Sequence, residues 1–488
     1  MNTHKTCTLN KSPGWALLRS TLFFLMVLSS SAWGQLISLK TIPVATGDQF
    51  LMFASENLAM GGVTIASPDS LMDHWVNPAT GSRISGMTVS SSPVYYSIGE
   101  GFGSAKAMPL NIVMNRGRWF GGAGLSVQAM NLAETNTFWW DPGVRTLSGN
   151  MEENIYLAGF VGRELGGLSI GVSGSYADLS ALDGVDLLYS NSIGLEQFGH
   201  LLDLRAGVLK SLKSGSQLEL VYLRNELDMT HKVTYQDWGV MEPFERIDTN
   251  LDHTVTHGLH LKLNTVVDAE GWRMGTIFTV NSKTHPKIPN YEIMNIPRDP
   301  GNTLGFNIGG GLSKESGLTR FGIDVVYEPI KSHTWAEADT FMISEDNELI
   351  RPGDMTIENH FDFSNWVLRS GVGWQKDERY FQLGMQMRTY NYELDQKDHV
   401  AATQRFQDEY WVEWTTTWGV TLNYEDLIIR YTGKTTMGTG RPGTNMSWGW
   451  RGGMFADASL GGDFIVAPSD ALTLQEARVM THQLSISV

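Results

Sequence analysis

Apolar and polar side chains alternate with a period of two residues along many segments of this chain. Leu259, Leu261 and Leu263 would share one face of a strand, and His260 and Lys262 would lie on the other. The same alternation runs through segments 304–313, 381–388 and 410–423. Such runs are long for strands of soluble proteins and suit tilted strands that cross a membrane. The pattern predicts an all-β chain, either a transmembrane barrel or a soluble sandwich or β-helix.

The lengths of the connections favour the barrel. Tight turns are expected at 115–118, 163–167, 211–216, 267–272, 313–319, 375–379 and 423–426. Long polar stretches fall between them, at 132–150, 178–197, 229–252, 283–302, 332–358 and 394–408. This strict alternation is typical of an outer-membrane barrel, with one rim in the periplasm and the other outside the cell. With a first strand at 84–97 and a last at 476–488, we expect an antiparallel transmembrane β-barrel of 14–16 strands.

Residues 1–34 have the organisation of a secretory signal peptide. A basic region with Lys5, Lys11 and Arg19 precedes the apolar run 21–28, and a small-residue cleavage site precedes Gln35. The single cysteine, Cys7, lies within this segment, so the mature chain would have no disulfide. Removing residues 1–34 takes away three positive charges and leaves a net charge of −19, which argues against nucleic acid as a partner.

Residues 35–82 precede the first predicted strand and do not alternate. A barrel of fourteen or more strands encloses a lumen too wide for its own side chains to fill, so we expect this segment to form an N-terminal hatch, or plug, inside the barrel at 83–488. Ser67 or Asp69 could cap a short helix at 70–76, which Asn77-Pro78 would end. A disordered periplasmic leader is the alternative, although such tails rarely contain so many Trp, Leu and Met residues.

One part of this segment resembles a known family. The residues 59–62 (AMGG), 68–70 (PDS) and 77–79 (NPA) are similar in type and spacing to the N-terminal hatch of FadL/TodX-type outer-membrane transporters of hydrophobic compounds. The plug motif on this chain would consist of Gly61, Gly62, Asn77, Pro78 and Ala79. Thr80 follows the triplet where the family usually has glycine. The motif is shared with the PorV-like barrels of type IX secretion, so it indicates a type of barrel more specifically than a cargo.

The resemblance implies passive uptake through the outer membrane of a Gram-negative bacterium. A hydrophobic small molecule, such as a long-chain fatty acid or an aromatic hydrocarbon, would dock among the outer loops. It would then enter a pocket above the hatch and leave through a gap in the wall. Burying apolar groups stabilises such a ligand by about 0.8 kcal/mol per CH₂, so no energy source is needed. Our candidate substrate-binding residues are Phe53, Leu71 and Trp75 in the hatch and Phe138, Trp139 and Trp140 in a long outer connection.

Two other functions stay open at this stage. The barrel could be a type IX secretion shuttle that holds secreted proteins with its outer loops. It could also be a porin for polar solutes, because the strand faces opposite the apolar ones carry charges of both signs, at Glu219, Lys262, Asp324, Arg388, Glu413 and Arg430. The other partners that we expect are outer-membrane lipid and lipopolysaccharide.

The sequence indicates no enzyme, no cofactor and no metal site. Gly433-Lys434-Thr435 lacks the preceding glycine of a phosphate loop. His253, His257 and His260 would not share one face of a strand. His360, Asp362 and Ser364 would share one face, but residues two apart on a strand are roughly 7 Å apart, too far for an activated serine. We expect these three to line the lumen as ordinary polar residues.

Overall fold

The computed structural model describes residues 35–99, 103–131, 135–138, 141–145, 151–185, 194–212, 215–238, 243–268, 270–284, 301–442 and 474–488. The predicted signal peptide at 1–34 lies outside these residues. The same is true of Trp139 and Trp140, two of the candidate substrate-binding residues.

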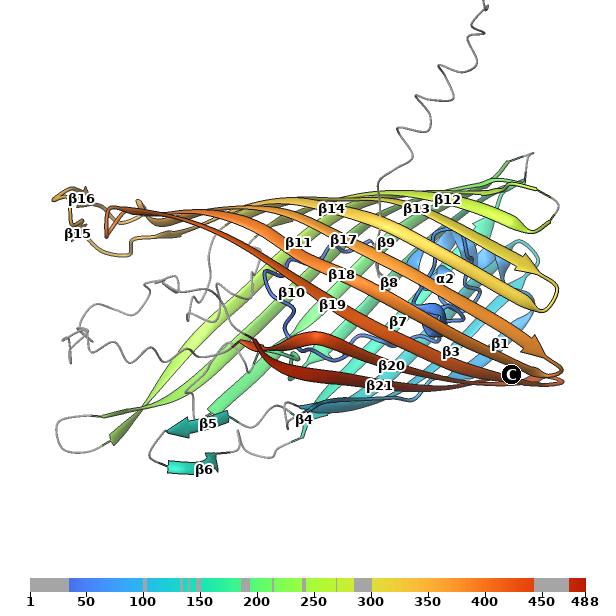
Figure 1. The fold of residues 1–488 in the computed structure, drawn as a ribbon, viewed down its shortest axis with the longest axis horizontal. Coiled ribbons are helices and arrows are strands. Elements are labelled where there is room, and N and C mark those ends of the chain that lie inside the picture. The colour runs from blue at the N-terminus through green and yellow to red at the C-terminus, as the bar shows by residue number, and fades with distance from the viewer. Residues whose placement is uncertain are drawn as a thin grey trace, which may run out of the picture.

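Antiparallel strands form one large sheet that closes on itself (Figure 1). Its first half consists of β1 (Met87–Ser91), β2 (Val94–Ile98), β3 (Ser104–Arg116), β4 (Trp119–Asn131), β7 (Glu152–Glu164), β8 (Leu168–Leu179), β9 (Gly194–Ser211), β10 (Gln217–Trp238) and β11 (Pro243–Val266). Its second half consists of β12 (Trp272–Thr284), β13 (Gly301–Ser316), β14 (Thr319–Glu337), β17 (Met355–Lys376), β18 (Arg379–Asp398), β19 (Thr403–Tyr424), β20 (Leu427–Pro442) and β21 (Leu474–Ser487). Two small hairpins lie outside the sheet, β5 (Thr135–Phe138) with β6 (Asp141–Arg145) and β15 (Met342–Ile343) with β16 (Leu349–Ile350).

The barrel closes between the beginning and the end of the chain. β1 and β2 both pair with β3 on one side and with β21 on the other, so together they make one interrupted strand. The interruption falls at Ser92 and Pro93, where proline has no backbone N–H to donate to a neighbour. Counted in this way the barrel has 16 strands, which confirms the predicted all-β transmembrane barrel at the upper end of its expected range.

The two faces of each strand differ as the alternation predicts. Leu259, Leu261 and Leu263 on β11 are 42%, 39% and 38% exposed on the outer surface, whereas His260 and Lys262 are 7% and 8% exposed toward the lumen. An apolar outer surface on a closed barrel suits a bilayer, because every strand pairs with its neighbours and no open sheet edge meets the lipid. The protein is an outer-membrane β-barrel of a Gram-negative bacterium.

All seven predicted tight turns join neighbouring strands, but two predicted long connections are wrong. β10 and β11 pair in register as far as Trp238 and Pro243, and β18 and β19 pair as far as Asp398 and Thr403. Most of segments 229–252 and 394–408 is therefore strand. We attribute the error to the outer extension of the barrel, where both faces meet water. The outward side chains there become polar while the backbone pairing continues.

Residues 35–84 lie inside the barrel, where Figure 1 shows them in blue. This N-terminal segment contains two 3-10 helices, η1 (Leu58–Met60) and η2 (Pro78–Arg83), and one turn of α-helix, α2 (Asp73–Val76). The predicted helix at 70–76 is thus shorter than expected. Before it, the carboxylate of Asp69 accepts the backbone N–H groups of Leu71 and Met72, both at 3.1 Å, which holds residues 70–72 as a turn. In the described part of the chain, no helix is long and apolar enough to cross a membrane.

Candidate functional site

The N-terminal segment presents an aromatic cluster to one side of the lumen. Phe53 stacks on Trp75 with ring centroids 4.2 Å apart and an interplanar angle of 11°. Phe160 of β7 meets the edge of Trp75 at 5.1 Å. Phe53 and Trp75 are more than nine-tenths buried, and they belong to the same apolar cluster as Met52 and Tyr156. Burial of this much aromatic surface fixes the segment against β4, β7 and β8.

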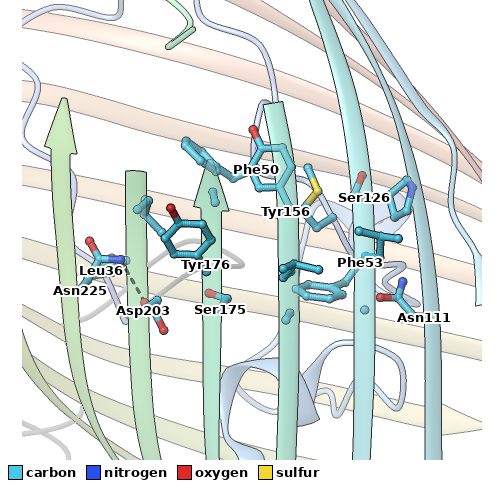
Figure 2. A pocket seen from close by; sticks show the side chains of 18 residues that line it. Leu36, Phe50, Phe53, Asn111, Ser126, Tyr156, Ser175, Tyr176, Asp203 and Asn225 are labelled. Carbon is cyan, nitrogen blue, oxygen red and sulfur yellow. Dashed lines mark hydrogen bonds between the residues drawn. The ribbon is translucent and has the colours of Figure 1, made fainter. Parts of the chain in front are cut away.

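An apolar cavity of about 290 Å³ lies between this cluster and the barrel wall. Leu36, Phe50, Met52 and Phe53 of the N-terminal segment form one side of it. The wall contributes residues from six strands, β3, β4 and β7 to β10: Pro109, Asn111, Gly124, Leu125, Ser126, Tyr156, Leu157, Ala158, Ser175, Tyr176, Ala177, Leu201, Asp203 and Asn225. Figure 2 shows the labelled side chains from the segment and from the wall gathered around this space.

Polar groups at one edge of the cavity are engaged with each other. Asp203 forms an ion pair with Arg205, with 2.6 Å between Oδ1 and Nε, and accepts a hydrogen bond of 3.2 Å from Asn225 (Figure 2). Tyr156 donates to the side chain of Gln128 at 2.8 Å. Asp203 is the one carboxylate among the described lining residues, so the cavity offers no set of metal ligands. Its remaining surface is mainly aromatic and aliphatic, which favours a hydrophobic ligand.

The N-terminal segment is seated on a group of inward-facing glycines, which we call the glycine belt. A Cβ added at Gly384 would lie 2.0 Å from the backbone nitrogen of Gly61, and one added at Gly371 would lie 2.3 Å from the oxygen of Met60. At Gly171 an added Cβ would meet the backbone of Pro78 at 2.7 Å. The belt comes from eight strands and comprises Gly171, Gly207, Gly275, Gly309, Gly311, Gly322, Gly371, Gly384 and Gly419. A side chain would displace the segment where the nearest atoms are its backbone, as at Gly171, Gly371 and Gly384, whereas an added Cβ at Gly322 meets only the side chain of Val63.

The structure places the residues of the predicted plug motif on this belt. Gly61 and Gly62 have φ values of 73° and 74°, a left-handed conformation that favours glycine. They let the chain turn directly against β17 and β18. Asn77 accepts the N–H of Ala79 at 3.1 Å and donates to Glu219 of β10 at 3.0 Å, so it both starts η2 and attaches it to the wall.

Charged lumen residues predicted from the sequence hold the same segment. The carboxylate of Asp324 on β14 accepts the backbone N–H groups of Thr64 at 2.7 Å and Ile65 at 3.2 Å. Lys262 donates to the carbonyl of Thr64 at 3.0 Å. Glu219 forms an ion pair of 2.8 Å with Arg83. Each of these three strand charges thus has a partner in the segment, where burial makes such contacts stronger than on an exposed surface. Arg388, by contrast, pairs with Glu328 of β14.

The six candidate substrate-binding residues do not form one site in the described part of the structure. Phe53 lines the cavity, whereas Trp75 lies behind Phe53 and does not line it. Leu71 is half-buried in the turn before α2 and is not among the lining residues. Phe138 ends strand β5, and Trp139 and Trp140 lie outside the described residues. The sequence analysis did not predict the lining residues Phe50, Met52, Tyr156 and Leu201. In the sequence, Tyr156 and Leu201 look like ordinary strand residues, because nothing there shows which part of the N-terminal segment faces them.

One prediction about the lumen is wrong. His360, Asp362 and Ser364 lie on the outward face of β17, next to the inward-facing Phe361 and Phe363. Asp362 pairs there with Lys331 at 2.9 Å, and Ser364 donates to the hydroxyl of Tyr327 at 3.2 Å. The alternation reverses in this part of β17, because its inner face packs with Ile37 and Leu39 of the N-terminal segment while its outer face meets water.

Comparisons with known proteins bear on the fold. No family model matches the chain, and no curated protein matches its sequence. Solved structures do match. The fold is similar to those of FadL- and TodX-type transporters. The Pseudomonas putida toluene transporter TodX shares 12% identity, with 88% of this chain and 96% of that chain covered and a TM-score of 0.36. A FadL homologue of Pseudomonas aeruginosa shares 9% identity, with 92% and 99% covered and a TM-score of 0.44.

An import receptor matches as well. The ferric-catecholate import receptor Fiu of E. coli K12 shares 7% identity, with 82% of this chain and 81% of that chain covered and a TM-score of 0.36. At these identities and TM-scores, the matches indicate a similar fold and nothing about the substrate. The substrate of the present protein therefore has to be argued from its own cavity.

Proposed function

We propose that the protein is a passive outer-membrane channel for hydrophobic small molecules, and that residues 35–84 form the hatch that closes it. The observation that supports this proposal is the apolar cavity between the N-terminal segment and the wall formed by β3, β4 and β7 to β10. A hydrophobic molecule would gain about 0.8 kcal/mol for each CH₂ moved from water into such a site. In the membrane, the apolar outer surface would contact lipid and lipopolysaccharide.

The size of the cavity supports a small ligand. An engineered cavity of about 150 Å³ lined by apolar side chains binds benzene. The cavity described above, at about 290 Å³, has room for a monoaromatic hydrocarbon or for part of a fatty-acid chain. Asp203 and Asn225 at one edge would contact the polar end of an amphipathic ligand, whereas Phe50 and Phe53 would contact its apolar part.

The lumen charges support this proposal over the polar-solute porin. A porin needs charged groups along an open aqueous path. Glu219, Lys262 and Asp324 instead bind the N-terminal segment, which lies across the lumen. The secretion-shuttle alternative places its function in the outer loops and makes no use of an apolar cavity.

Filling the cavity tests the proposed function. Ala158→Phe and Ser175→Phe together would place two rings in the space that a ligand needs. We expect cells that express the wild-type protein to take up radiolabelled toluene or dodecanoate faster than cells without it. The double variant should lose at least about five-sixths of that gain. Val161→Phe is the matched control, because Val161 lies on the outward face of β7 and is 49% exposed.

Three results would contradict the proposal. The first is equal uptake with and without the protein. The second is unchanged uptake by the folded double variant. The third is a steady ion conductance of the wild-type protein in planar bilayers, which would favour the porin. Secreted proteins retained in a pulldown, without any effect on hydrocarbon uptake, would favour the shuttle.

A further inference from the structure

Two histidines and a glutamate converge on the outer surface, on strands that do not line the cavity. His333 of β14 and His360 of β17 are directly opposite each other in the register of the two strands. Their rings stack with centroids 4.3 Å apart. Both Nε2 atoms point at Oε1 of Glu358, at 3.1 Å for His333 and 3.0 Å for His360. These three ligand atoms all lie within 4.8 Å of one another.

A third histidine lies beside this group. His399 directly follows β18, and its backbone N–H donates to the carbonyl of Thr356 on β17 at 2.8 Å. Its Nε2 lies 3.9 Å from the second carboxylate oxygen of Glu358. The four side chains, which we call the histidine cluster, therefore come from two strands and the turn after a third: His333, Glu358, His360 and His399. All four are partly exposed, with side-chain exposures of 34%, 19%, 49% and 42% in that order.

The outward residues of β14 and β17 place the histidine cluster above the bilayer. Tyr327 and Trp366 pair across these strands with ring centroids 4.9 Å apart, as in the aromatic girdle at a membrane interface. Between this pair and the cluster lies the exposed ion pair of Lys331 and Asp362, which would be costly within hydrocarbon. His360 is six residues beyond Trp366, roughly 20 Å along the strand. The cluster is thus open to the external medium.

Two of the three separations between the ligand atoms are close to those of a tetrahedral metal site. With metal–ligand bonds of about 2.0–2.1 Å, neighbouring ligand atoms of a tetrahedral zinc site are roughly 3.3 Å apart. The two histidine–glutamate separations of 3.1 and 3.0 Å are close to this value. Imidazole with one carboxylate is a donor set that suits Zn²⁺, Cu²⁺ and Ni²⁺, whereas Ca²⁺ and Mg²⁺ prefer oxygen ligands alone.

We propose that the histidine cluster binds a divalent transition-metal ion of the zinc class at the outer end of the barrel. The rings of His333 and His360, whose planes are 3° apart, tilt so that both Nε2 atoms face the ion. With Glu358 they supply three ligands, and His399, turned toward the ion, supplies the fourth. Asp395 and Lys397 face His360 and Glu358 from β18 and add one charge of each sign. A bound ion would connect β14, β17 and the end of β18 where they extend beyond the membrane.

Zinc titration of the full-length mature protein tests this site. The protein is purified in detergent with a tag that contains no histidine, treated with EDTA, and titrated with Zn²⁺ against a competing dye. Native mass spectrometry counts the ions bound. We expect one Zn²⁺ per barrel at micromolar concentration, and an affinity at least tenfold lower for His333→Gln/His360→Gln. His257→Gln is the matched control, because His257 is also exposed on the outer surface but bonds to the hydroxyl of Tyr222.

Two further measurements check the folding of each variant and identify the metal ligands. Heat-modifiable migration in gel electrophoresis shows whether each variant is folded, and Glu358→Gln replaces the double variant if that one fails to fold. X-ray absorption of the zinc-loaded protein should show nitrogen and oxygen ligands with imidazole scattering. No stoichiometric zinc binding, an equal loss in the His257→Gln control, or a spectrum without imidazole would overturn the proposal.

Discussion

His74 and Asp73 are adjacent residues of α2 whose pKa values are shifted in opposite directions by the same cause. Burial lowers the pKa of His74 to about 4, since its ring packs between Trp75 and Phe160. Burial also raises the pKa of Asp73 to about 6, with Lys262 and Arg83 opposing this rise. Both shifts mean that the folded segment disfavours a charged side chain, but the two groups become charged at opposite ends of the pH range.

The two residues should therefore give the hatch compensating pH dependences. As the pH falls from 7 to 4.5, His74 takes up a proton in the unfolded segment at about pH 6.5 but stays neutral in the folded one. Through His74, acidification therefore lowers the free energy of unfolding of the segment. Over the same range, Asp73 takes up a proton in the folded segment, which removes the free-energy cost of burying its charged carboxylate. We expect His74→Gln to remove the first effect, so that acidification stabilises this variant by about 2 kcal/mol relative to wild type.

Hydrogen exchange of peptides covering residues 69–80, corrected for the intrinsic effect of pH, measures this difference. Asp73→Asn is the matched control, because it should shift the pH dependence in the opposite direction. If wild type and His74→Gln respond alike to acid, then His74 is not held neutral by its surroundings.

At the scale of elements, the glycine belt is the contact surface between the N-terminal segment, our proposed hatch, and the wall. Gly384→Ala would place a methyl carbon 2.0 Å from the nitrogen of Gly61. The nearest atoms belong to the backbone of Met60 and Gly61, so they cannot rotate away as a side chain could. Overpacking of this kind typically costs about 1–3 kcal/mol. Because the strands are held by pairing on both sides, we expect the hatch to be displaced while the barrel stays intact.

Displacement of the hatch should be visible as a leak. The Gly384→Ala variant should conduct ions in planar bilayers and lose hydrogen-exchange protection at residues 58–64, whereas wild type should do neither. Gly310→Ala is the control, since Gly310 has nothing within 4 Å of an added Cβ. A closed Gly384→Ala variant with full protection would show that the belt is not what seats the hatch.

The sequence predicted the elements of this molecule better than their contacts. Alternation at residues such as Leu259 to Leu263 identified strands and their two faces, because lipid and lumen impose opposite chemistry on neighbouring residues. It could not identify the cavity or the glycine belt. Gly384 and Gly61, like Phe53 and Tyr156, meet only when a segment far away in sequence enters the lumen. The histidine cluster was missed for the same reason, since its members are spread from residue 333 to residue 399 over separate strands.

In the molecule as a whole, hydrogen bonds and ion pairs attach the N-terminal segment to several sides of the barrel wall. Asp324, Lys262 and Glu219 attach the N-terminal segment on one side of the lumen. Across from them, Lys434 forms an ion pair of 2.7 Å with Asp48, and Gln483 donates to the carbonyl of Phe53 at 3.1 Å. A solute that passes through this barrel must therefore either follow the apolar cavity around the hatch or shift the hatch itself.

A disulfide between hatch and wall distinguishes these two routes. A Cβ added at Gly322 of β14 would lie 3.3 Å from the Cβ of Val63, close to the separation of about 3.5–4.5 Å that a disulfide requires. The predicted mature chain contains no cysteine that would compete. If transport requires the hatch to move, oxidised Val63→Cys/Gly322→Cys should lose at least about nine-tenths of its hydrocarbon uptake and regain it on reduction. Each single-cysteine variant under the same oxidation is the control. Full uptake by the locked barrel would mean that the solute moves past a stationary hatch, along the wall that lines the cavity.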